Sequence, residues 1–274
     1  MLIIKDIYNL HTYLKAYRDK GYSIGYIPTM GALHEGHGSL IKRSHNDNQK
    51  TIISIFINKK QFNDTEDFEA YPRNTGDDYN FCEKHNVDII FEPSTGEIYP
   101  KEYKSIQNSH FQNILCDQYR PGHFDGVVTV LNRLFSIIES EKVYFGEKDF
   151  QQLKIVEILI KENFPNLELV PVSTVRLAEG IALSSRNSKL SKKQMTDFIS
   201  FQKEVIQFIA NLDKKINLIE ANKQAEEFIK SYEKFDYFEF RNASNLSLEG
   251  SLVEARLFYA IYKSGVRLID NLEL

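Results

Sequence analysis

The first two thirds of the chain alternate between short apolar runs and longer segments in which apolar residues recur with helical spacing. The apolar runs are rich in β-branched residues, as expected for strands that are covered on both faces. Strands are predicted at 25–27, 51–57, 87–91, 142–145 and 167–172. Helices are predicted at 10–20, 35–48, 76–85, 124–138 and 149–163. Because strands and helices that alternate at this spacing are joined by right-handed crossovers, the pattern predicts an α/β fold with a parallel, doubly wound sheet.

The pattern changes after Asn187. Ser191 and Gln194 have the spacing of a capping box and predict a helix that extends to about residue 211. A second helix is predicted at 217–232, and strands are predicted at 235–241, 255–262 and 266–269. We therefore expect a Rossmann-like domain over 1–175 and a smaller C-terminal α+β domain over 176–274. The first domain lacks the G-x-G-x-x-G fingerprint of dinucleotide binders.

The stretch 25–41, GYIPTMGALHEGHGSLI, carries the densest candidate chemistry. It predicts a strand that passes through a tight turn into a helix, with His34 and His37 on one face of the helix start. The open N–H groups and positive dipole end of a helix suit an anion, and two imidazoles add further donors. Gly31 and Gly36 allow a tight turn and a close ligand. The pattern predicts a phosphate site, although half of a metal site or two surface histidines would show the same spacing.

Polar residues also follow the next predicted strand. In a parallel sheet the carboxyl ends of the strands lie along one edge, and ligands bind outside that edge. Asn58 and Gln61 follow the strand at 51–57 and offer neutral amides that can bind hydroxyl or carboxylate oxygens. We therefore expect both amides near the histidine turn, although Gln61 alone would also be an ordinary loop residue.

A third polar junction follows the strand at 142–145. Gly146 ends this strand, Lys148 is placed to reach a phosphate, and Asp149 can accept hydrogen bonds from ribose hydroxyls. Asp149 and Gln152 also have the spacing of a helix capping box, which leaves a purely structural interpretation open.

The composition is that of an ordinary globular protein, with 42% apolar and 26% charged residues among 274. The net charge of −4 argues against a nucleic-acid partner, which usually requires a basic face. The N-terminal segment mixes both signs of charge without a long apolar run, so we expect neither a signal peptide nor a membrane span and place the protein in the cytosol. Cys82 and Cys116 lack ligand-like spacing and are interpreted as reduced thiols.

The segment 28–37, PTMGALHEGH, resembles the His-x-Gly-His signature of the cytidylyltransferase-like superfamily. The residues around this signature are most similar to those of the pantothenate synthetase family. Further motifs resemble that family in the same order along nearly the whole chain. They are 54–62 with 66–68 and 71–73, 120–127, 144–152 and 175–187. The chain departs from the family pattern at Lys59, where proline is usual, at Gly38, where a larger apolar residue is usual, and at 177–179.

The resemblance implies an ATP-dependent ligase. Pantoate would react with ATP to give pantoyl adenylate and pyrophosphate, and β-alanine would then displace AMP to give pantothenate. The resemblance also implies that Mg²⁺ accompanies ATP, without a dedicated metal ligand in the protein, and that the protein is a homodimer without nucleic-acid or membrane partners.

The resemblance assigns a role to individual positions. The catalytic residues would be His37, as the proton donor to the triphosphate, with His34, Lys148 and Arg186. The ATP-binding residues would be Met30, Gly31, His34, Gly36, His37, Gly146, Glu147, Lys148, Asp149, Val175, Leu183, Ser184, Ser185 and Arg186. Pantoate would contact the Met30 backbone, Gln61 and Gln152, with Gln61 also near β-alanine. The C-terminal domain would act as a lid, with 120–124 as a candidate wall of the site.

Other functions fit parts of this pattern. A nucleotidyltransferase of the same superfamily that acts on another small acid or phosphate would share His-x-Gly-His, as would a protein similar to aminoacyl-tRNA synthetases. Neither explains the segments around Gln61 and Gln152, and the acidic balance disfavours an RNA partner. A non-catalytic nucleotide binder is disfavoured because every polar group expected for catalysis is present.

Overall fold

The computed structural model describes residues 1–232, 234–263 and 265–274. The chain divides into two compact units. Unit 1 comprises 1–112, 120–147 and 152–173, and unit 2 comprises 113–119, 148–151 and 174–274. Two short segments that lie well before the expected boundary at 175, namely 113–119 and 148–151, therefore group with unit 2.

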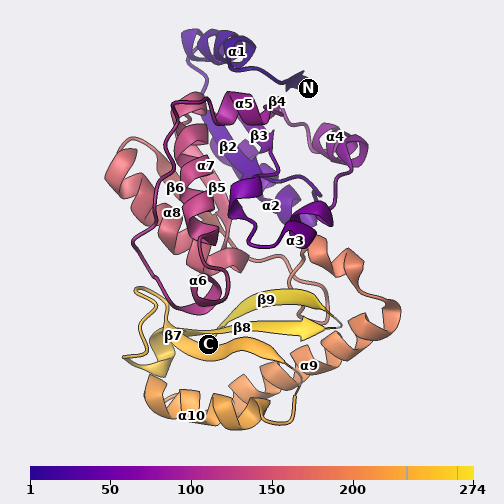
Figure 1. Cartoon of the computed structure of the whole chain (residues 1–274), viewed down its shortest axis with the longest axis vertical. Coiled ribbons are helices and arrows are strands. Elements are labelled where there is room, and N and C mark those ends of the chain that lie inside the picture. Colours follow the sequence, from indigo (N-terminus) through magenta and orange to yellow (C-terminus); the bar gives the residue numbers. More distant parts are fainter. Residues whose placement is uncertain (233, 264) are drawn as a thin grey trace. The chain divides into compact units, whose positions relative to one another are not determined.

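Unit 1, all of which is described, is built on a six-stranded parallel sheet with the order β1-β4-β3-β2-β5-β6 (Figure 1). The strands are β1 (Leu2–Ile4), β2 (Ile24–Thr29), β3 (Lys50–Ile55), β4 (Ile89–Phe91), β5 (Lys142–Gly146) and β6 (Glu168–Val172). The predicted parallel α/β sheet is confirmed. The short edge strand β1 was not predicted, because it has only three residues and leaves Leu2 and Ile3 exposed.

Helices cover both faces of this sheet (Figure 1). They are α1 (Ile7–Asp19), α2 (Glu35–Asp47), α3 (Thr65–Glu69), α4 (Thr75–Lys84), α5 (Thr95–Ile98), α7 (His123–Ile138) and α8 (Phe150–Asn163), whose first two residues group with unit 2. Ile27 of β2 packs in one cluster with Ile41 of α2, whereas the ring of Tyr26 meets Phe135 of α7 edge-on. Because neighbouring residues of a strand face opposite sides, both faces of β2 are buried, which explains its apolar run.

The strand β2 is longer than predicted and includes Pro28 and Thr29. The ladder between β2 and β5 includes only Gly25 and Tyr26 of β2, so Pro28 lies beyond it and no bond on that side requires its missing N–H. The strand order reverses between β2 and β5. In an open parallel sheet, such a switch point is where ligands bind, outside the carboxyl ends of the two strands.

The described residues of unit 2 form an antiparallel sheet of three strands with the order β7-β8-β9 (Figure 1). The elements are α6 (Leu115–Tyr119), α9 (Lys192–Asn211), α10 (Leu218–Ile229), β7 (Phe235–Asn242), β8 (Ala255–Lys263) and β9 (Val266–Glu273). The predicted capping box of Ser191 and Gln194 is confirmed at the start of α9. Phe238 and Phe240 are buried in the core of this unit. The strand β9 continues past its predicted end at residue 269. The prediction ended too early because Asp270 and Asn271 are polar, although both are buried within the strand.

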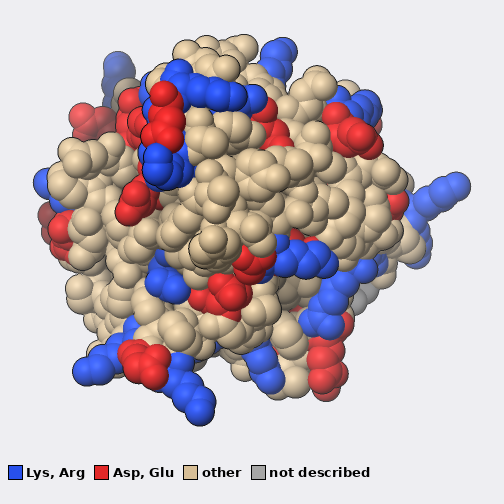
Figure 2. Space-filling view, turned by 90° about the horizontal axis from the view of Figure 1, so that it is seen from above, with Lys and Arg blue, Asp and Glu red and all other residues tan. Residues whose placement is uncertain are grey.

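The surface shows mixed charge. On the face in Figure 2, basic and acidic side chains lie interspersed around broad areas that carry neither. None of the helices formed by the described residues combines the length and the apolar character needed to span a bilayer.

Candidate active site

The switch point of unit 1 brings three of the predicted junctions to one edge of the sheet. The histidine turn follows β2, Asn58 and Gln61 follow β3, and Gly146 ends β5. Since β2 pairs with both β3 and β5 in parallel, the carboxyl ends of all three strands point to the same side. The first turn of α8, which carries Gln152, begins at this edge as well.

His34 and His37 close the N-terminus of α2 by binding its backbone with their rings. The Nδ1 atom of His34, the N-cap residue, accepts a hydrogen bond from the N–H of Gly36 at 3.1 Å. The Nδ1 atom of His37 accepts one from the N–H of His34 at 3.2 Å. Because Nδ1 is the acceptor in both rings, each neutral imidazole carries its proton on Nε2. The ring centroids are 4.3 Å apart, so two Nε2–H donors lie together at the positive end of a 13-residue helix.

Asp78 of α4 holds the turn that precedes these histidines. Its carboxylate accepts hydrogen bonds from the N–H groups of Ala32 at 3.0 Å and Leu33 at 2.7 Å. Gly31 has a φ of +79°, and a Cβ on it would lie 2.7 Å from Asp78 Oδ2, so the turn requires glycine here. Burial raises the pKa of Asp78, while the two backbone N–H groups lower it in part. From its position in the first turn of α4 alone, Asp78 would be assigned only a favourable charge at the helix start.

Thr29 connects the end of β2 to β3. Its hydroxyl donates to the carbonyl of Ser54 at 2.7 Å and accepts from the N–H of Gly31 at 3.2 Å. The backbone of Met30 is thereby held between two fixed residues at the edge of the sheet.

Gln61 is buried, and its amide is oriented by Asn58. Asn58 Nδ2 donates to Gln61 Oε1 at 3.1 Å and to the carbonyl of Gly126 at 2.9 Å. Asn58 Oδ1 accepts from the Lys60 N–H and from the Tyr99 hydroxyl. The expectation that Asn58 offers a ligand amide was wrong, because these contacts use its bonding capacity. Since Gln61 Oε1 already accepts from Asn58, its Nε2 group is the part of the side chain left to donate to a ligand.

The start of α7 braces the backbone of Gln61. The carbonyl of Gln61 accepts from His123 Nδ1 at 2.7 Å and from Arg120 Nη2 at 3.3 Å. A Cβ on Gly126 would lie only 2.4 Å from the Lys60 carbonyl oxygen, so α7 packs directly against the 3-10 turn η1 (Lys59–Gln61). Arg120 and His123, both in the segment 120–124, thus hold the backbone of Gln61. The role of this segment as a wall of the site stays a prediction.

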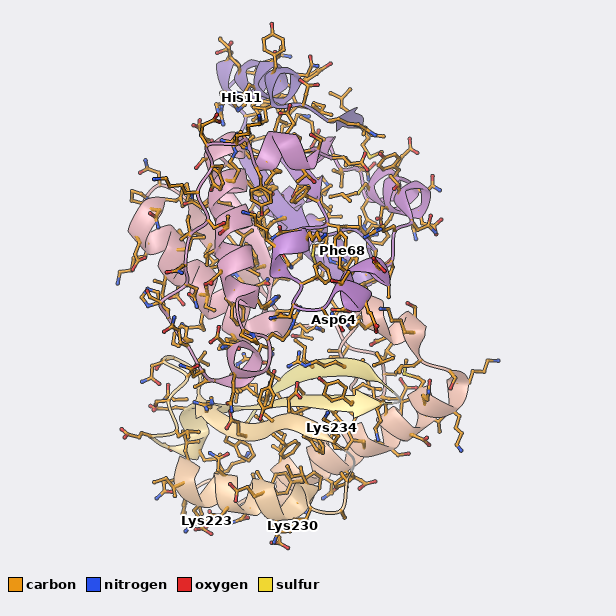
Figure 3. All side chains as sticks on the ribbon, in the orientation of Figure 1. His11, Asp64, Phe68, Lys223, Lys230 and Lys234 are labelled. Carbon is orange, nitrogen blue, oxygen red and sulfur yellow. The ribbon has the colours of Figure 1, made fainter. Side chains whose placement is uncertain are left out.

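Two departures from the family pattern have local packing explanations. Lys59 Nζ lies 5.6 Å from the ring centroid of Phe68 on α3, a residue labelled in Figure 3, so a cation–π contact connects η1 to α3. A Cβ on Gly38 would meet the carboxylate of Glu35 and the ring of His85, each at 2.9 Å. The His85 ring therefore fills the space that a larger residue at 38 would need.

The residues after β5 divide between the two units. Gly146 and Glu147 group with unit 1, whereas Lys148 and Asp149 group with unit 2. Lys148 Nζ lies 3.5 Å from Asp149 Oδ1, and the Lys148 side chain is 18% exposed. A mostly covered ammonium beside a single exposed carboxylate is suited to a further anionic partner.

The two glutamines that follow have different roles. Gln151 is buried in unit 2, where its Oε1 accepts from the Cys116 N–H and its Nε2 donates to the Ile114 carbonyl. Gln152 lies in the first turn of α8, in unit 1, and is half-buried. Gln151 thus anchors the segment 113–119, whereas Gln152 groups with the unit that contains β5.

In unit 2 the segment 175–183 folds back on itself as a hairpin. The N–H of Leu183 donates to the carbonyl of Val175, and the N–H of Leu177 donates to the carbonyl of Ile181. Directly after the hairpin, Ser184 Oγ accepts from the N–H of Arg186 at 3.2 Å and caps the 3-10 turn η3 (Ser185–Lys189). The predicted residues Ser184, Ser185 and Arg186 therefore form one capped turn.

The predicted site residues thus form two sets, one in each unit. Those of unit 1 are Met30, Gly31, His34, Gly36, His37, Gln61, Gly146, Glu147 and Gln152, all along the carboxyl edge of the sheet. Those of unit 2 are Lys148, Asp149, Val175, Leu183, Ser184, Ser185 and Arg186. Within the part of the chain that the structure describes, no group of three or more His, Cys, Asp or Glu side chains is arranged to hold a metal ion.

Comparison with known proteins gives a consistent result. The family model described as pantoate-beta-alanine ligase matches residues 2–273. The pantothenate synthetase of Leptospira biflexa serovar Patoc is 40% identical over 282 residues, covering 99% of this chain and 98% of the relative. That of Aquifex aeolicus is 38% identical over 281 residues, covering 98% of each.

Solved structures of similar proteins have the same fold. The structure of pantothenate synthetase from Thermus thermophilus matches with a TM-score of 0.87 at 31% identity, covering 100% of this chain and 99% of that one. The structure of pantoate-beta-alanine ligase from Francisella tularensis, complexed with beta-gamma ATP and beta-alanine, matches with a TM-score of 0.83 at 34% identity, covering 100% and 97%.

Proposed function

The chain belongs to the pantoate-beta-alanine ligase family, and we propose that it makes pantothenate in two steps that begin at the carboxyl edge of the unit 1 sheet. In the first step a carboxylate oxygen of (R)-pantoate attacks the α-phosphorus of ATP, and the bond to pyrophosphate breaks. In the second step the amine of β-alanine attacks the acyl carbon of the adenylate, and AMP leaves. The Francisella relative, which is 34% identical, is described with ATP and β-alanine ligands, which supports these substrates.

The histidine turn is the observation that carries this proposal. In the first step negative charge builds up on the phosphate oxygens, and fixed donors that already point at those oxygens lower the barrier without reorganisation. The Nε2–H groups of His34 and His37 and the N-terminus of α2 supply such donors. We assign His37 as the proton donor to the leaving pyrophosphate and His34 as a phosphate ligand.

The pantoate subsite follows from the polar groups beside this turn. Gln61 Nε2 is directed by Asn58 to act as a donor, which suits a carboxylate or hydroxyl oxygen. Gln152 at the start of α8 and the backbone of Met30 would complete the contacts to pantoate. Gln61 would also lie near β-alanine in the second step.

Unit 2 would supply the remaining nucleotide contacts. Lys148 and the capped turn of Ser184, Ser185 and Arg186 offer positive charge and N–H donors for phosphate oxygens. The family resemblance implies that Asp149 and backbone groups near Gly146 and Val175 bind the ribose and adenine. It also implies that ATP lies near Gly31, Gly36, Glu147 and Leu183. Because an acyl adenylate hydrolyses readily, we retain the proposal that 176–274 acts as a lid.

Magnesium fits this site as a companion of ATP. This proposal rests on the family resemblance, which implies that Mg²⁺ accompanies ATP. When bound, Mg²⁺ would neutralise charge on the phosphates. The residues of this chain would do the rest, by binding the nucleotide and orienting the pantoate carboxylate.

We further propose that the protein is a homodimer in the cytosol, as the family resemblance implies. Light scattering coupled to size-exclusion chromatography tests the oligomeric state directly, and a mass equal to one chain would reject the dimer.

The reaction is tested by mass spectrometry of purified protein with Mg²⁺, ATP and (R)-pantoate, before and after β-alanine is added. We expect enzyme-bound pantoyl adenylate and pyrophosphate first, and pantothenate with AMP after the amine is added. A parallel reaction with an unrelated hydroxy acid in place of pantoate is the control. Absence of pantoate-dependent pyrophosphate would reject the proposed function.

A further inference from the structure

The last strand of the chain connects the two segments of unit 2 that carry its expected nucleotide contacts. Asp270 and Asn271 are consecutive residues of β9, and both are buried. One of them binds the hairpin that leads to Ser184, and the other binds the backbone of Lys148. Neither residue lies in a motif that the sequence pointed to.

Asp270 holds the hairpin through Arg176. The guanidinium of Arg176 forms a bidentate pair with the Asp270 carboxylate, at 2.6 and 3.0 Å, and also donates to the Asn271 carbonyl at 2.7 Å. The same guanidinium donates to the carbonyl of Gly180 at the hairpin tip, at 2.9 Å. A single ion pair, whose carboxylate is buried, therefore fixes both the base and the tip of the segment 175–183.

A second set of contacts reinforces the same point. Gln202 of α9 donates to the Gly180 carbonyl at 3.5 Å and accepts a hydrogen bond from the Tyr259 hydroxyl. The Tyr259 hydroxyl lies 3.4 Å from Asp270 Oδ2. The Asp270 side chain is 2% exposed, so these contacts are made away from water, where charged hydrogen bonds fix geometry most firmly.

Asn271 holds the other segment. Its Nδ2 donates to the carbonyl of Lys148 at 2.9 Å, and its Oδ1 accepts from Arg256 Nη1 at 2.8 Å. The Arg256 guanidinium also lies over the ring of Phe150, 4.4 Å from its centroid. The residues on both sides of Asp149 are thus fixed to the sheet of unit 2.

From these contacts we propose that Asp270 and Asn271 are positioning residues for ATP, which set the spacing between the Lys148 segment and the turn of Ser184, Ser185 and Arg186. The proposal rests on the proposed function, because it takes those segments as nucleotide ligands. A triphosphate makes several charged contacts at once, so the segments that hold it must keep a fixed distance and orientation relative to each other. Two adjacent residues of one strand fix that arrangement.

Two substitutions separate the two connections. Asp270→Asn keeps the shape of the side chain but removes the charge that pairs with Arg176. Asn271→Asp keeps an oxygen acceptor for Arg256 but places an oxygen against the Lys148 carbonyl, where a donor is needed. The second change leaves the ion pair intact, so it remains informative if Asp270→Asn folds poorly.

The chain offers a matched control. Asp236 of β7 forms a buried pair with Arg267 of β9, with Arg267 Nε 2.6 Å from Asp236 Oδ2, and its side chain is 6% exposed. Asp236→Asn therefore makes the same chemical change in the same sheet without touching either nucleotide segment. Any effect of lost stability alone should appear in this variant as well.

The test combines kinetics with two measurements that need no reaction. We expect each site variant to raise KM for ATP about tenfold while KM for pantoate stays near the wild-type value. Affinity for a non-hydrolysable ATP analogue, measured by calorimetry, should fall by the same factor. In hydrogen exchange, Asp270→Asn should expose the amides of 175–187, and Asn271→Asp those of 146–151. Asp236→Asn should show none of these changes.

The outcomes separate this inference from the proposed function. Unchanged ATP affinity in both site variants, or an equal loss in Asp236→Asn, would overturn the positioning role even if the ligase reaction is real. If the wild type makes no pantothenate, the proposed function fails, and the binding and exchange measurements still decide whether these residues position a nucleotide.

Discussion

Gly126 offers the sharpest test of how the pantoate subsite is built. A methyl group at this position would lie 2.4 Å from the Lys60 carbonyl oxygen and 2.6 Å from the Gln61 nitrogen. Ordinary contacts of a Cβ begin near 3.4 Å, so α7 and η1 must separate by about 1 Å in a Gly126→Ala variant. The contact is with backbone on both sides, which leaves no side chain to rotate away.

The expected result is a specific defect in pantoate use. Forcing a methyl group into a packed interface costs about 1–3 kcal/mol of stability, so the variant should fold with a lower melting temperature. The displacement also carries Gln61 with it, because the Gly126 carbonyl binds Asn58 and Asn58 orients Gln61. A misplacement of about 1 Å at a reacting site costs on the order of 100-fold, so we expect kcat/KM for pantoate to fall by about that factor.

The assay is pantoate-dependent release of pyrophosphate at saturating ATP, with KM for ATP measured separately. Gly76→Ala in α4 is the matched control, because a Cβ at Gly76 meets nothing within 4 Å. That variant should keep wild-type kinetics. The reasoning would be refuted by wild-type kcat/KM for pantoate in Gly126→Ala, or by an equal rise in KM for ATP.

Three further predictions concern single side chains. His37→Ala should slow adenylate formation by about 100-fold or more, because it removes the assigned proton donor. The variant should still fold, since one capping bond is worth about 1 kcal/mol. A variant that unfolds or keeps full activity would contradict this prediction. Because burial raises the pKa of Asp78 above 3.8, the folded state binds this proton more tightly than the unfolded chain. The free energy of unfolding of the wild type, relative to that of Asp78→Asn, should therefore be greatest below the ordinary pKa of an aspartate and should decline as the pH rises through the raised pKa of Asp78. Urea midpoints that show the opposite trend with pH would contradict this prediction. Burial raises the pKa of Cys82 to about 12, so an aromatic disulfide reagent should label this thiol only after unfolding, and fast labelling of the native protein would show the prediction to be wrong.

The sheet of unit 1 was predictable because its signal is local. Strands buried on both faces are apolar throughout, and each is followed by a helix with its own spacing and polar start. The same logic placed His34 and His37 at a helix N-terminus, since the turn and the cap are encoded within a few residues. The strands β1 and β9 were missed or shortened because exposed apolar residues in one and buried polar residues in the other break the pattern.

The supports of the site were not predictable because they join distant parts of the chain. Asp78 is 46 residues from Ala32, and Asp270 is 94 residues from Arg176. Nothing near Asp78 distinguishes a carboxylate that holds a turn from one that favours a helix start. Gly126 did carry a signal, since a glycine within an apolar helix often marks a close backbone approach, but the sequence does not say which backbone approaches.

The central claim is that pantoate is activated as an adenylate, and labelled pantoate tests it most directly. Pantoate carrying a heavy oxygen isotope in its carboxylate is allowed to react with ATP and β-alanine, and the AMP is analysed by mass spectrometry. Attack on the α-phosphorus leaves one carboxylate oxygen with AMP, so we expect AMP that carries one heavy oxygen for each pantothenate formed. Unlabelled AMP, or label in inorganic phosphate instead, would contradict the account.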